Sequence, residues 1–135
     1  MIDRPCLHLV VRTPREVVAD LTALSLRVPA DTGQVGIRPR GEAIVTPVEP
    51  GLVLIRTADG MRFVGTAGGL LRTAAREAVL LTPVAALGDD AAAVLAAVDA
   101  ALAAPDPERE LRQAIERLEA GLLREVHGGD RGERR

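Results

Sequence analysis

Residues 33–51 read GQVGIRPRGEAIVTPVEPG and place turn-forming residues between short apolar pairs. Glycine reaches backbone conformations that other residues avoid, and proline fixes φ, so the two together make stiff corners. The apolar pairs between these corners are too short for helices and suit β-strands. The stretch therefore predicts short strands joined by rigid turns.

The same pattern of short apolar runs continues on both sides of this stretch, as far as residue 84. Residues 23–28 alternate in character, with Leu24, Leu26 and Val28 on one side, as in a strand with one solvated face. Residues 52–55 are apolar throughout, which favours a central strand, and Asp59-Gly60 predicts a tight hairpin. We expect an all-β sandwich or flattened barrel over residues 1–87. Further strands are expected around Leu7–Val11, Val17-Val18, Ile44-Val45, Phe63-Val64, Leu70-Leu71 and Val79–Leu81.

After Gly88 the apolar residues change to helical spacing and form two stripes. The stripes are separated by APDP at residues 104–107, in which Asp106 can cap a second helix that begins at Pro107 and ends at Gly128-Gly129. This pattern predicts a C-terminal α-helical hairpin over residues 88–128 and a disordered charged tail at 129–135. Spacing alone does not distinguish packing within the hairpin from oligomerisation. The expected seam comprises Val94, Leu95, Val98, Leu102, Leu111, Ile115, Leu118 and Leu122.

Composition argues against several classes of protein. The chain has one Phe, no Trp, no Tyr and a formal net charge of -2, so it lacks both stacking platforms and a basic field for nucleic acid. A single cysteine, Cys6, allows no internal disulfide and fits a reducing compartment. No signal peptide or membrane-spanning apolar run is recognisable. We expect a protein that is cytoplasmic, or peripheral on the cytoplasmic side, with no nucleic-acid partner.

Four motifs occur in a particular order along the chain. They are LHLVVRTP at residues 7–14, G-x-x-G-I-x-P at residues 33–39, Thr46 with Pro50-Gly51, and GGLL at residues 68–71. Together with the helical segment after residue 88, this order resembles the epsilon subunit of the F-type rotary ATP synthase. The final helix, rich in Arg, Leu and Glu, also resembles that of the alternative sodium-linked branch of F-type ATPases.

The resemblance implies a β-sandwich foot and a helical hairpin on the central stalk of an ATP synthase. Such a subunit has no active site. It couples the gamma subunit to the polar loops of the membrane c-type ring in ion-gradient-driven ATP synthesis or hydrolysis. Its hairpin can restrain hydrolysis through the alpha and beta subunits. We therefore expect a peripheral location on the cytoplasmic face of the plasma membrane, within that complex.

The resemblance also assigns roles to the corner quoted above. Its polar residues would contact the ring, and its glycines and prolines, with those of the later turns, would hold the backbone in place. The chain departs from the family where Pro39 is followed by Arg40-Gly41-Glu42 instead of the usual Gly-His-Ala, which alters the charge offered to the ring. The expected ring-contact residues are Gln34, Arg38, Arg40, Gly41 and Glu42, and the structural corner residues are Gly33, Gly36, Pro39, Pro50, Gly51, Gly68 and Gly69.

Nucleotide binding is not expected on the hairpin. Some family members bind ATP there through an Ile/Leu-Asp-x-x-Arg-Ala motif. The corresponding residues 91–96 read AAAVLA, and the nearest lookalike, VDAALA at residues 98–103, has Leu102 in place of the arginine. We therefore predict weak or absent ATP binding and no cofactor.

Other candidate sites are incomplete. Cys6 and His8 share a strand face, but a zinc site lacks further ligands, and the lone serine, Ser25, has no nucleophile-elbow glycines. Asp89-Asp90 suits a helix N-terminus, and Gly68-Gly69 lacks the lysine of a phosphate-binding loop. We expect no catalytic residue and no metal. The alternative to a stalk subunit is a free-standing β-sandwich binding module that dimerises through its helical tail.

Overall fold

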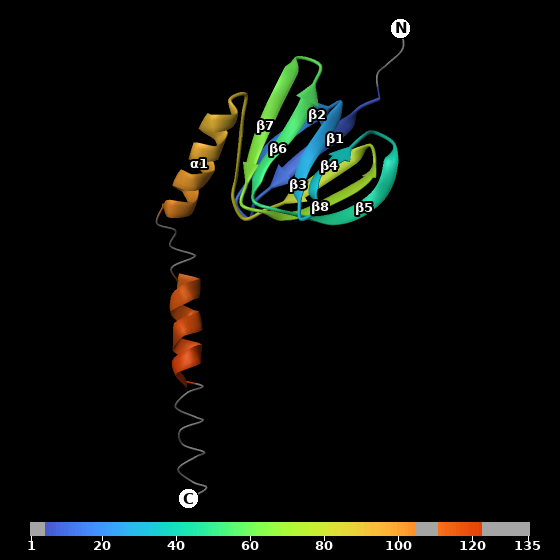
Figure 1. Ribbon diagram of the computed structural model, residues 1–135. Helices are drawn as coiled ribbons and strands as arrows, with labels where there is room; N and C mark the ends of the chain where they lie inside the picture. The colour runs from blue at the N-terminus through green and yellow to red at the C-terminus, as the bar shows by residue number, and fades with distance from the viewer. Residues whose placement is uncertain (1–4, 105–110, 123–135) are drawn as a thin grey trace, which may run out of the picture. The chain divides into compact units, whose positions relative to one another are not determined.

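The computed structural model describes residues 5–104 and 111–122. Within them the chain forms ten strands in two five-stranded sheets and two helices, one of them at residues 111–122 (Figure 1). The order is β2-β1-β9-β8-β5 in the first sheet, sheet A, and β10-β7-β6-β3-β4 in the second, sheet B. The strands and first helix are β1 Leu7–Arg12, β2 Val17–Ala23, β3 Ser25–Ala30, β4 Gly33–Ile37, β5 Gly41–Val48, β6 Gly51–Thr57, β7 Gly60–Thr66, β8 Gly69–Ala75, β9 Glu77–Leu81, β10 Ala85–Gly88 and α1 Ala91–Ala103.

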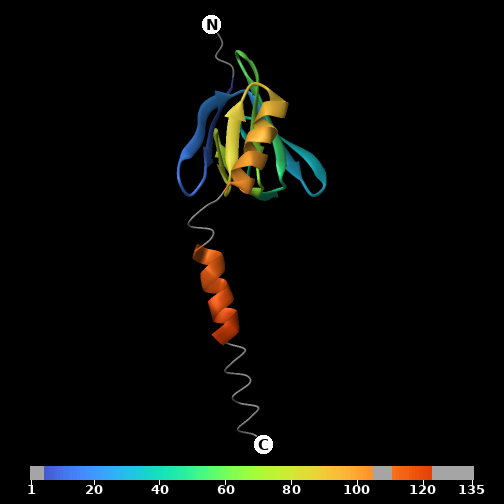
Figure 2. The same ribbon diagram turned by 90° about the vertical axis from the view of Figure 1, so that its left-hand side faces the viewer.

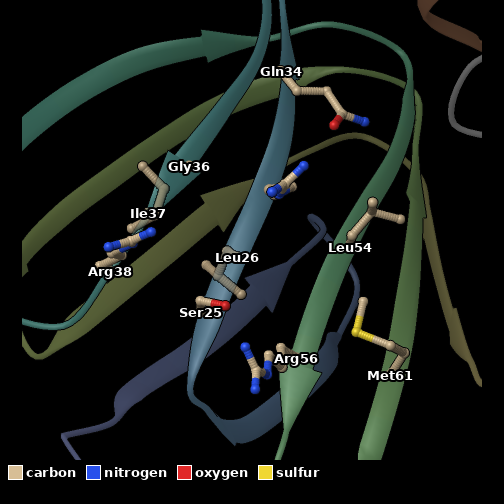
Figure 3. A pocket seen from close by; sticks show the side chains of 10 residues that line it. Ser25, Leu26, Gln34, Gly36, Ile37, Arg38, Leu54, Arg56 and Met61 are labelled. Carbon is tan, nitrogen blue, oxygen red and sulfur yellow. The ribbon is translucent and has the colours of Figure 1, made fainter.

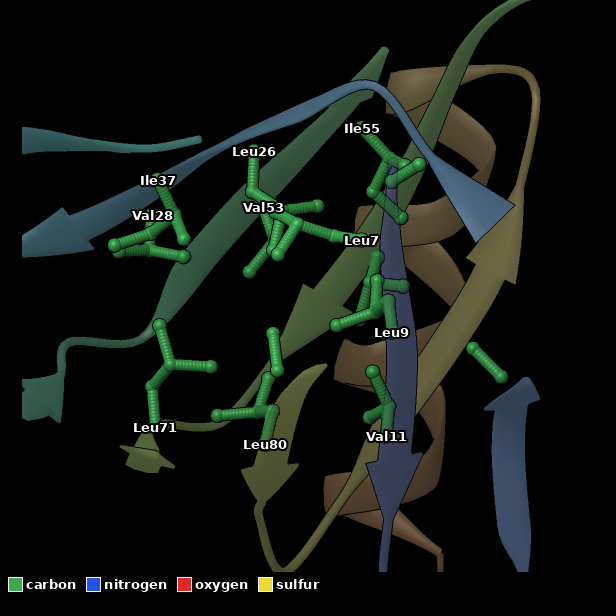
Figure 4. Packing of buried hydrophobic residues seen from close by; sticks show 14 of the residues in the cluster. Leu7, Leu9, Val11, Leu26, Val28, Ile37, Val53, Ile55, Leu71 and Leu80 are labelled. Atoms are coloured by element: carbon green, nitrogen blue, oxygen red, sulfur yellow. The ribbon is translucent and has the colours of Figure 1, made fainter. Parts of the chain in front are cut away.

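The core lies between the two sheets and is built from aliphatic side chains (Figure 4). Strand β1 shows how it forms, because Leu7, Leu9 and Val11 point inward and are buried while His8 and Arg12 point outward. Leu71 and Leu80 join this layer from the other strands of sheet A, and Leu26, Val28, Val53 and Ile55 face it from sheet B. The predicted β-sandwich is confirmed.

Three details of the strand pattern differ from the sequence prediction, and the first is that strand β10, Ala85–Gly88, was not expected. Strand β3 begins at Ser25, and Leu24 lies in the bend before it. Ala23, which the alternation placed on a solvated face, ends β2 and is fully buried in the core, because the bend reverses the alternation. The predicted central strand is confirmed as β6, the third of five strands in sheet B. The predicted hairpin joins β6 to β7, with Thr57 paired to Gly60.

Two buried threonines hold the turn before Gly69. The hydroxyls of Thr66 and Thr82 lie 2.7 Å apart, and the Gly68 amide donates to Thr66 Oγ1 at 3.1 Å. Thr82 Oγ1 lies within donating distance of the Gly68 carbonyl, at 2.8 Å, and of the Val84 carbonyl, at 3.1 Å. These polar groups are therefore satisfied inside the fold, which ties the β7–β8 turn to the segment between β9 and β10.

Helix α1 lies along the outer side of β7 and β10 (Figures 1 and 2). Val94 and Val98, one turn apart, are buried there against Gly65 and Gly88. A Cβ atom at Gly65 would lie 2.8 Å from Val98 Cγ2 and 2.9 Å from Val94 Cγ1, so the glycine permits this close approach. The first compact unit accordingly extends over Met1–Leu102, past residue 87, where the sequence suggested the end of the sandwich.

Leu95 and Leu102 of α1 are exposed, as are Leu111, Ile115, Leu118 and Leu122 of the helix at residues 111–122. Of the expected seam, Val94 and Val98 thus pack on the sandwich. Packing of the two helices as a hairpin stays a prediction. The proposed cap at Asp106, the stop at Gly128-Gly129 and the charged tail lie outside the described residues.

Candidate functional site

The outer face of sheet A carries an apolar patch that faces solvent. Val45, Leu70 and Leu81 are 62%, 43% and 51% exposed. Strand register brings them together, because Leu70 of β8 pairs with Leu81 of β9, and Val45 of β5 pairs with Arg72 of β8. Val10 and Val79, which pair across β1 and β9, join the patch from the middle of the sheet. An apolar patch of this kind on an outer face is typical of a protein-docking surface.

Charged side chains surround the patch. Arg12, Arg72 and Glu77 line the same shallow hollow of about 560 Å³, together with His8. The His8 imidazole Nε2 contacts Asp20 Oδ1 from the neighbouring strand β2. An apolar centre with a charged rim is the usual anatomy of a protein–protein interface. We define the apolar residues Val10, Val45, Leu70, Val79 and Leu81 as the sheet A patch.

This patch was not expected from the sequence, although the sequence contains a signal for it. Strands β1, β8 and β9 contain adjacent apolar residues, as in Leu70-Leu71 and Leu80-Leu81. In a strand, adjacent residues point to opposite faces, so one member of each pair fills the core and the other must lie outside it. The apolar pairs therefore indicated a sheet with two apolar faces.

The predicted ring-contact residues lie where the chain passes from sheet B to sheet A. Gln34 is on β4, Arg38 and Arg40 lie between β4 and β5, and Gly41 and Glu42 begin β5. All five are exposed. The turn is held by the Gly41 amide, which donates to the Arg38 carbonyl at 3.2 Å, and by the Arg40 amide, which donates to the Ala75 carbonyl at 3.2 Å. The corner is thus an exposed, polar turn that two backbone hydrogen bonds tether.

Arg40 occupies this turn in a left-handed conformation, with φ of 63°. It stands where the family pattern has glycine, so the chain carries a conformational penalty there. Replacing Arg40 with glycine should raise the free energy of unfolding by about 0.5–1 kcal/mol, since relief of the left-handed strain exceeds the added entropy of the unfolded chain. Urea unfolding followed by circular dichroism would measure the change.

Arg38→Gly is the matched control for Arg40→Gly. Arg38 is equally exposed and does not have positive φ, so this change should lower stability by about 0.5–1 kcal/mol. An equal loss in both variants would show that the conformation of Arg40 has no energetic cost.

The predicted structural corner residues form two groups. Gly33, Gly36 and Pro39 belong to β4 and the turn after it. Pro50 and Gly68 lie together although they are far apart in sequence, since a Cβ at Gly68 would lie 3.3 Å from Pro50 Cδ. Gly51 and Gly69 begin the strands that follow these two turns. The second group therefore joins the β5–β6 turn to the β7–β8 turn.

The described residues bring no catalytic set together. Ser25 lies on the outer face of sheet B, whereas His8 contacts Asp20 on sheet A. Cys6 directly precedes β1 and is not part of the strand as expected. Within residues 5–104 and 111–122, His, Cys, Asp and Glu side chains form no group of three that could hold a metal. Neither described helix has the length and apolar character needed to cross a membrane.

Comparison with protein families identifies the family of this β-sandwich. Residues 6–88 match the family model of the ATP synthase delta/epsilon chain, β-sandwich domain. The chain belongs to the ATP synthase delta/epsilon family. The resemblance to F-type ATP synthase epsilon subunits that the sequence motifs indicated is thereby confirmed.

Individual epsilon chains show how far the similarity extends. The ATP synthase epsilon chain of Verminephrobacter eiseniae is 32% identical over 118 residues, 83% of this chain and 86% of the relative. The epsilon chain of Polaromonas naphthalenivorans is 34% identical over 85 residues, 62% of each chain, so this chain spans less than two thirds of that relative's length. The chloroplastic epsilon chain of Gossypium barbadense is 30% identical over 86% of this chain and 76% of its own.

Among solved structures, a chain of the Euglena gracilis mitochondrial ATP synthase, OSCP/F1/c-ring in rotational state 1, has the same fold. The TM-score is 0.57 at 18% identity, with 87% of this chain and 81% of that chain covered.

Proposed function

We propose that this chain is a non-catalytic subunit of the central stalk that couples a gamma subunit to a membrane c-type ring during ion-gradient-driven rotation. The observation that carries the proposal is the sheet A patch. Three large apolar residues exposed together on one face are unfavourable in water and favour a partner that covers them. Membership of the ATP synthase delta/epsilon family supplies the kind of assembly in which such a face would be covered. The subunit contributes stiffness and contact surface, and no reacting group.

Two surfaces of the sandwich together couple the gamma subunit to the ring. The sheet A patch binds the gamma subunit, because burial of aliphatic side chains gives a large favourable free energy that does not depend on a particular orientation. The tethered polar corner from Gln34 to Glu42 contacts the ring. Polar groups suit this contact, because the polar loops of a ring can then pair with them instead of being left without hydrogen-bond partners. Torque passes between the two surfaces through a sandwich whose densely packed core transmits strain.

The helical segment would regulate ATP hydrolysis and would not transmit torque between the gamma subunit and the ring. Its exposed leucines, such as Leu102 and Leu118, provide apolar surface for a partner helix or for alpha and beta subunits. Residues 91–96 lack the charged side chains of the ATP-binding motif, so regulation would proceed without bound nucleotide. The assembly would be peripheral on the cytoplasmic face of the plasma membrane.

Affinity purification from solubilised source membranes tests the proposal. A tagged copy of the chain should recover gamma, alpha, beta and ring subunits in stoichiometric amounts, identified by mass spectrometry. Recovery of a homodimer alone would refute the proposal and support the free-standing binding module.

A further inference from the structure

The outer face of sheet B contains a shallow hollow lined by three arginines, which neither the core nor the sheet A patch uses. The hollow has a volume of about 600 Å³. Arg27 comes from β3, Arg56 comes from β6, and Arg38 directly follows β4. Figure 3 shows Ser25 between Arg38 and Arg56.

Strand register explains why the arginines converge. On one side of β3, Ser25 pairs with Arg56 of β6. On the other side, Leu26 pairs with Ile37 of β4, so the next residue, Arg38, lies opposite Ser25. Arg27 lies two residues along β3 from Ser25 and therefore on the same face. Neighbouring strands are about 4.8 Å apart, so the Cα atoms of Arg38 and Arg56 lie about 10 Å apart, with Ser25 between them.

These three side chains lack anionic partners within the described part of the chain. No Asp or Glu lines the hollow, and the side chains of Arg27, Arg38 and Arg56 make no ion pair or hydrogen bond with a described residue. Guanidinium groups stay charged at neutral pH. A chain of formal net charge -2 thus gathers three uncompensated cations at one place. An anion that enters the hollow would therefore meet three cations without a competing carboxylate in the lining.

The other lining groups indicate the kind of anion. Leu54 and Met61 contribute apolar surface, and Met61 is 46% exposed. An inorganic anion would leave this surface in water. The lining contains no aromatic side chain on which a nucleotide base could stack. A peptide that alternates carboxylates with apolar side chains would satisfy both kinds of lining group.

We propose that this hollow binds an acidic segment of a partner polypeptide, whose carboxylates pair with Arg27, Arg38 and Arg56 while an apolar side chain covers Leu54 and Met61. Arginine suits this role because its planar donors bind carboxylates in a bidentate manner. Arg38 and Gln34 of this hollow also belong to the corner assigned to the ring. The inference is still tested independently of the stalk function, because Arg27 and Arg56, which the test changes, lie outside both that corner and the sheet A patch.

The test is fluorescence anisotropy with the full-length protein and a labelled hexapeptide, Glu-Leu-Glu-Leu-Glu-Leu. Saturable binding is expected at about 50 mM salt, with clear weakening at about 300 mM, because exposed charge pairs are screened. The Gln-Leu-Gln-Leu-Gln-Leu peptide, which has the same shape without the charge, should bind at least about tenfold more weakly.

Variants locate the binding. Arg27→Gln/Arg56→Gln should weaken peptide binding at least about tenfold, since it removes two of three charge pairs from exposed positions without disturbing the core. Arg76→Gln, an exposed arginine in the β8–β9 turn, should change it less than about twofold. Equal binding by the wild type and the double variant would overturn the proposal, as would equal binding of the two peptides or no peptide binding at all.

Two further probes distinguish other anions. Inorganic phosphate at about 10 mM and phosphatidylglycerol vesicles are each expected to compete weakly with the peptide, through general screening alone. Tight binding of either probe that depends on Arg27 and Arg56, without peptide binding, would assign the hollow to that anion and refute the peptide. Failure of this experiment leaves subunit recovery from membranes unaffected, so the two proposals fail separately.

Discussion

Replacing Gly69 with alanine is expected to lower the free energy of unfolding by about 3 kcal/mol or more. A Cβ atom at this position would lie 2.0 Å from the Leu81 carbonyl oxygen and 3.0 Å from its carbonyl carbon. Both are backbone atoms, which cannot rotate away as a side chain can. Relief requires β8 and β9 to separate where Leu70 pairs with Leu81. The glycine is thus needed for close approach of two strands.

Urea unfolding followed by far-ultraviolet circular dichroism would measure this loss, because the chain has no Trp or Tyr to report by fluorescence. Gly36→Ala is the matched control. A Cβ at Gly36 meets no atom within 4 Å, and its φ is not positive, so stability should change by less than about 0.5 kcal/mol. If Gly69→Ala were as mild as the control, the close contact with Leu81 would not exist in solution.

Changing Leu70 and Leu81 together to aspartate should weaken binding to the gamma subunit by at least about 100-fold. The reason is that both residues lie within the sheet A patch, and central apolar residues of an interface each contribute about 2 kcal/mol or more. Introduced carboxylates would also have to be buried without partners. The fold itself should survive, because Leu70 is 43% and Leu81 is 51% exposed. Biolayer interferometry with purified gamma subunit would measure the dissociation constant.

A control for this variant adds the same charge elsewhere. Ala58→Asp/Ala100→Asp places two aspartates at exposed positions, one in the β6–β7 turn and one on α1. Gamma binding should then stay within about threefold of the wild type. Equal weakening by both double variants would mean that net charge, and not the sheet A patch, governs the association. Unchanged binding of Leu70→Asp/Leu81→Asp would exclude the patch as the gamma-binding surface.

Most of the β-sandwich could be predicted from local patterns. Short apolar runs, separated by Gly and Pro, identify strands because the backbone requirements of turns are local. The exceptions lie where the chain bends. Ala23 lies in the core and not on the expected solvated face, since the single bend residue Leu24 between β2 and β3 shifts the period of two that defines a face.

The candidate sites were less predictable. The corner from Gln34 to Glu42 could be located because a family motif marks it, although the left-handed conformation of Arg40 could not. The three arginines of the hollow on sheet B could not be grouped. Arg27 and Arg56 lie on separate strands, Arg38 follows a third strand, and only the strand order brings them together.

The sequence by itself determined most of the strands, the helical segment after Gly88, where rigid turns lie and which family the motifs resemble, because these depend on neighbouring residues along the chain. Only the tertiary structure decided that α1 packs Val94 and Val98 against Gly65, and that Leu70 and Leu81 face solvent while Leu71 and Leu80 fill the core. The physical reason is that burial depends on which strands pair and on which side of the sheet a second layer packs. Both are relationships between residues distant in sequence, and short-range periodicity does not contain them.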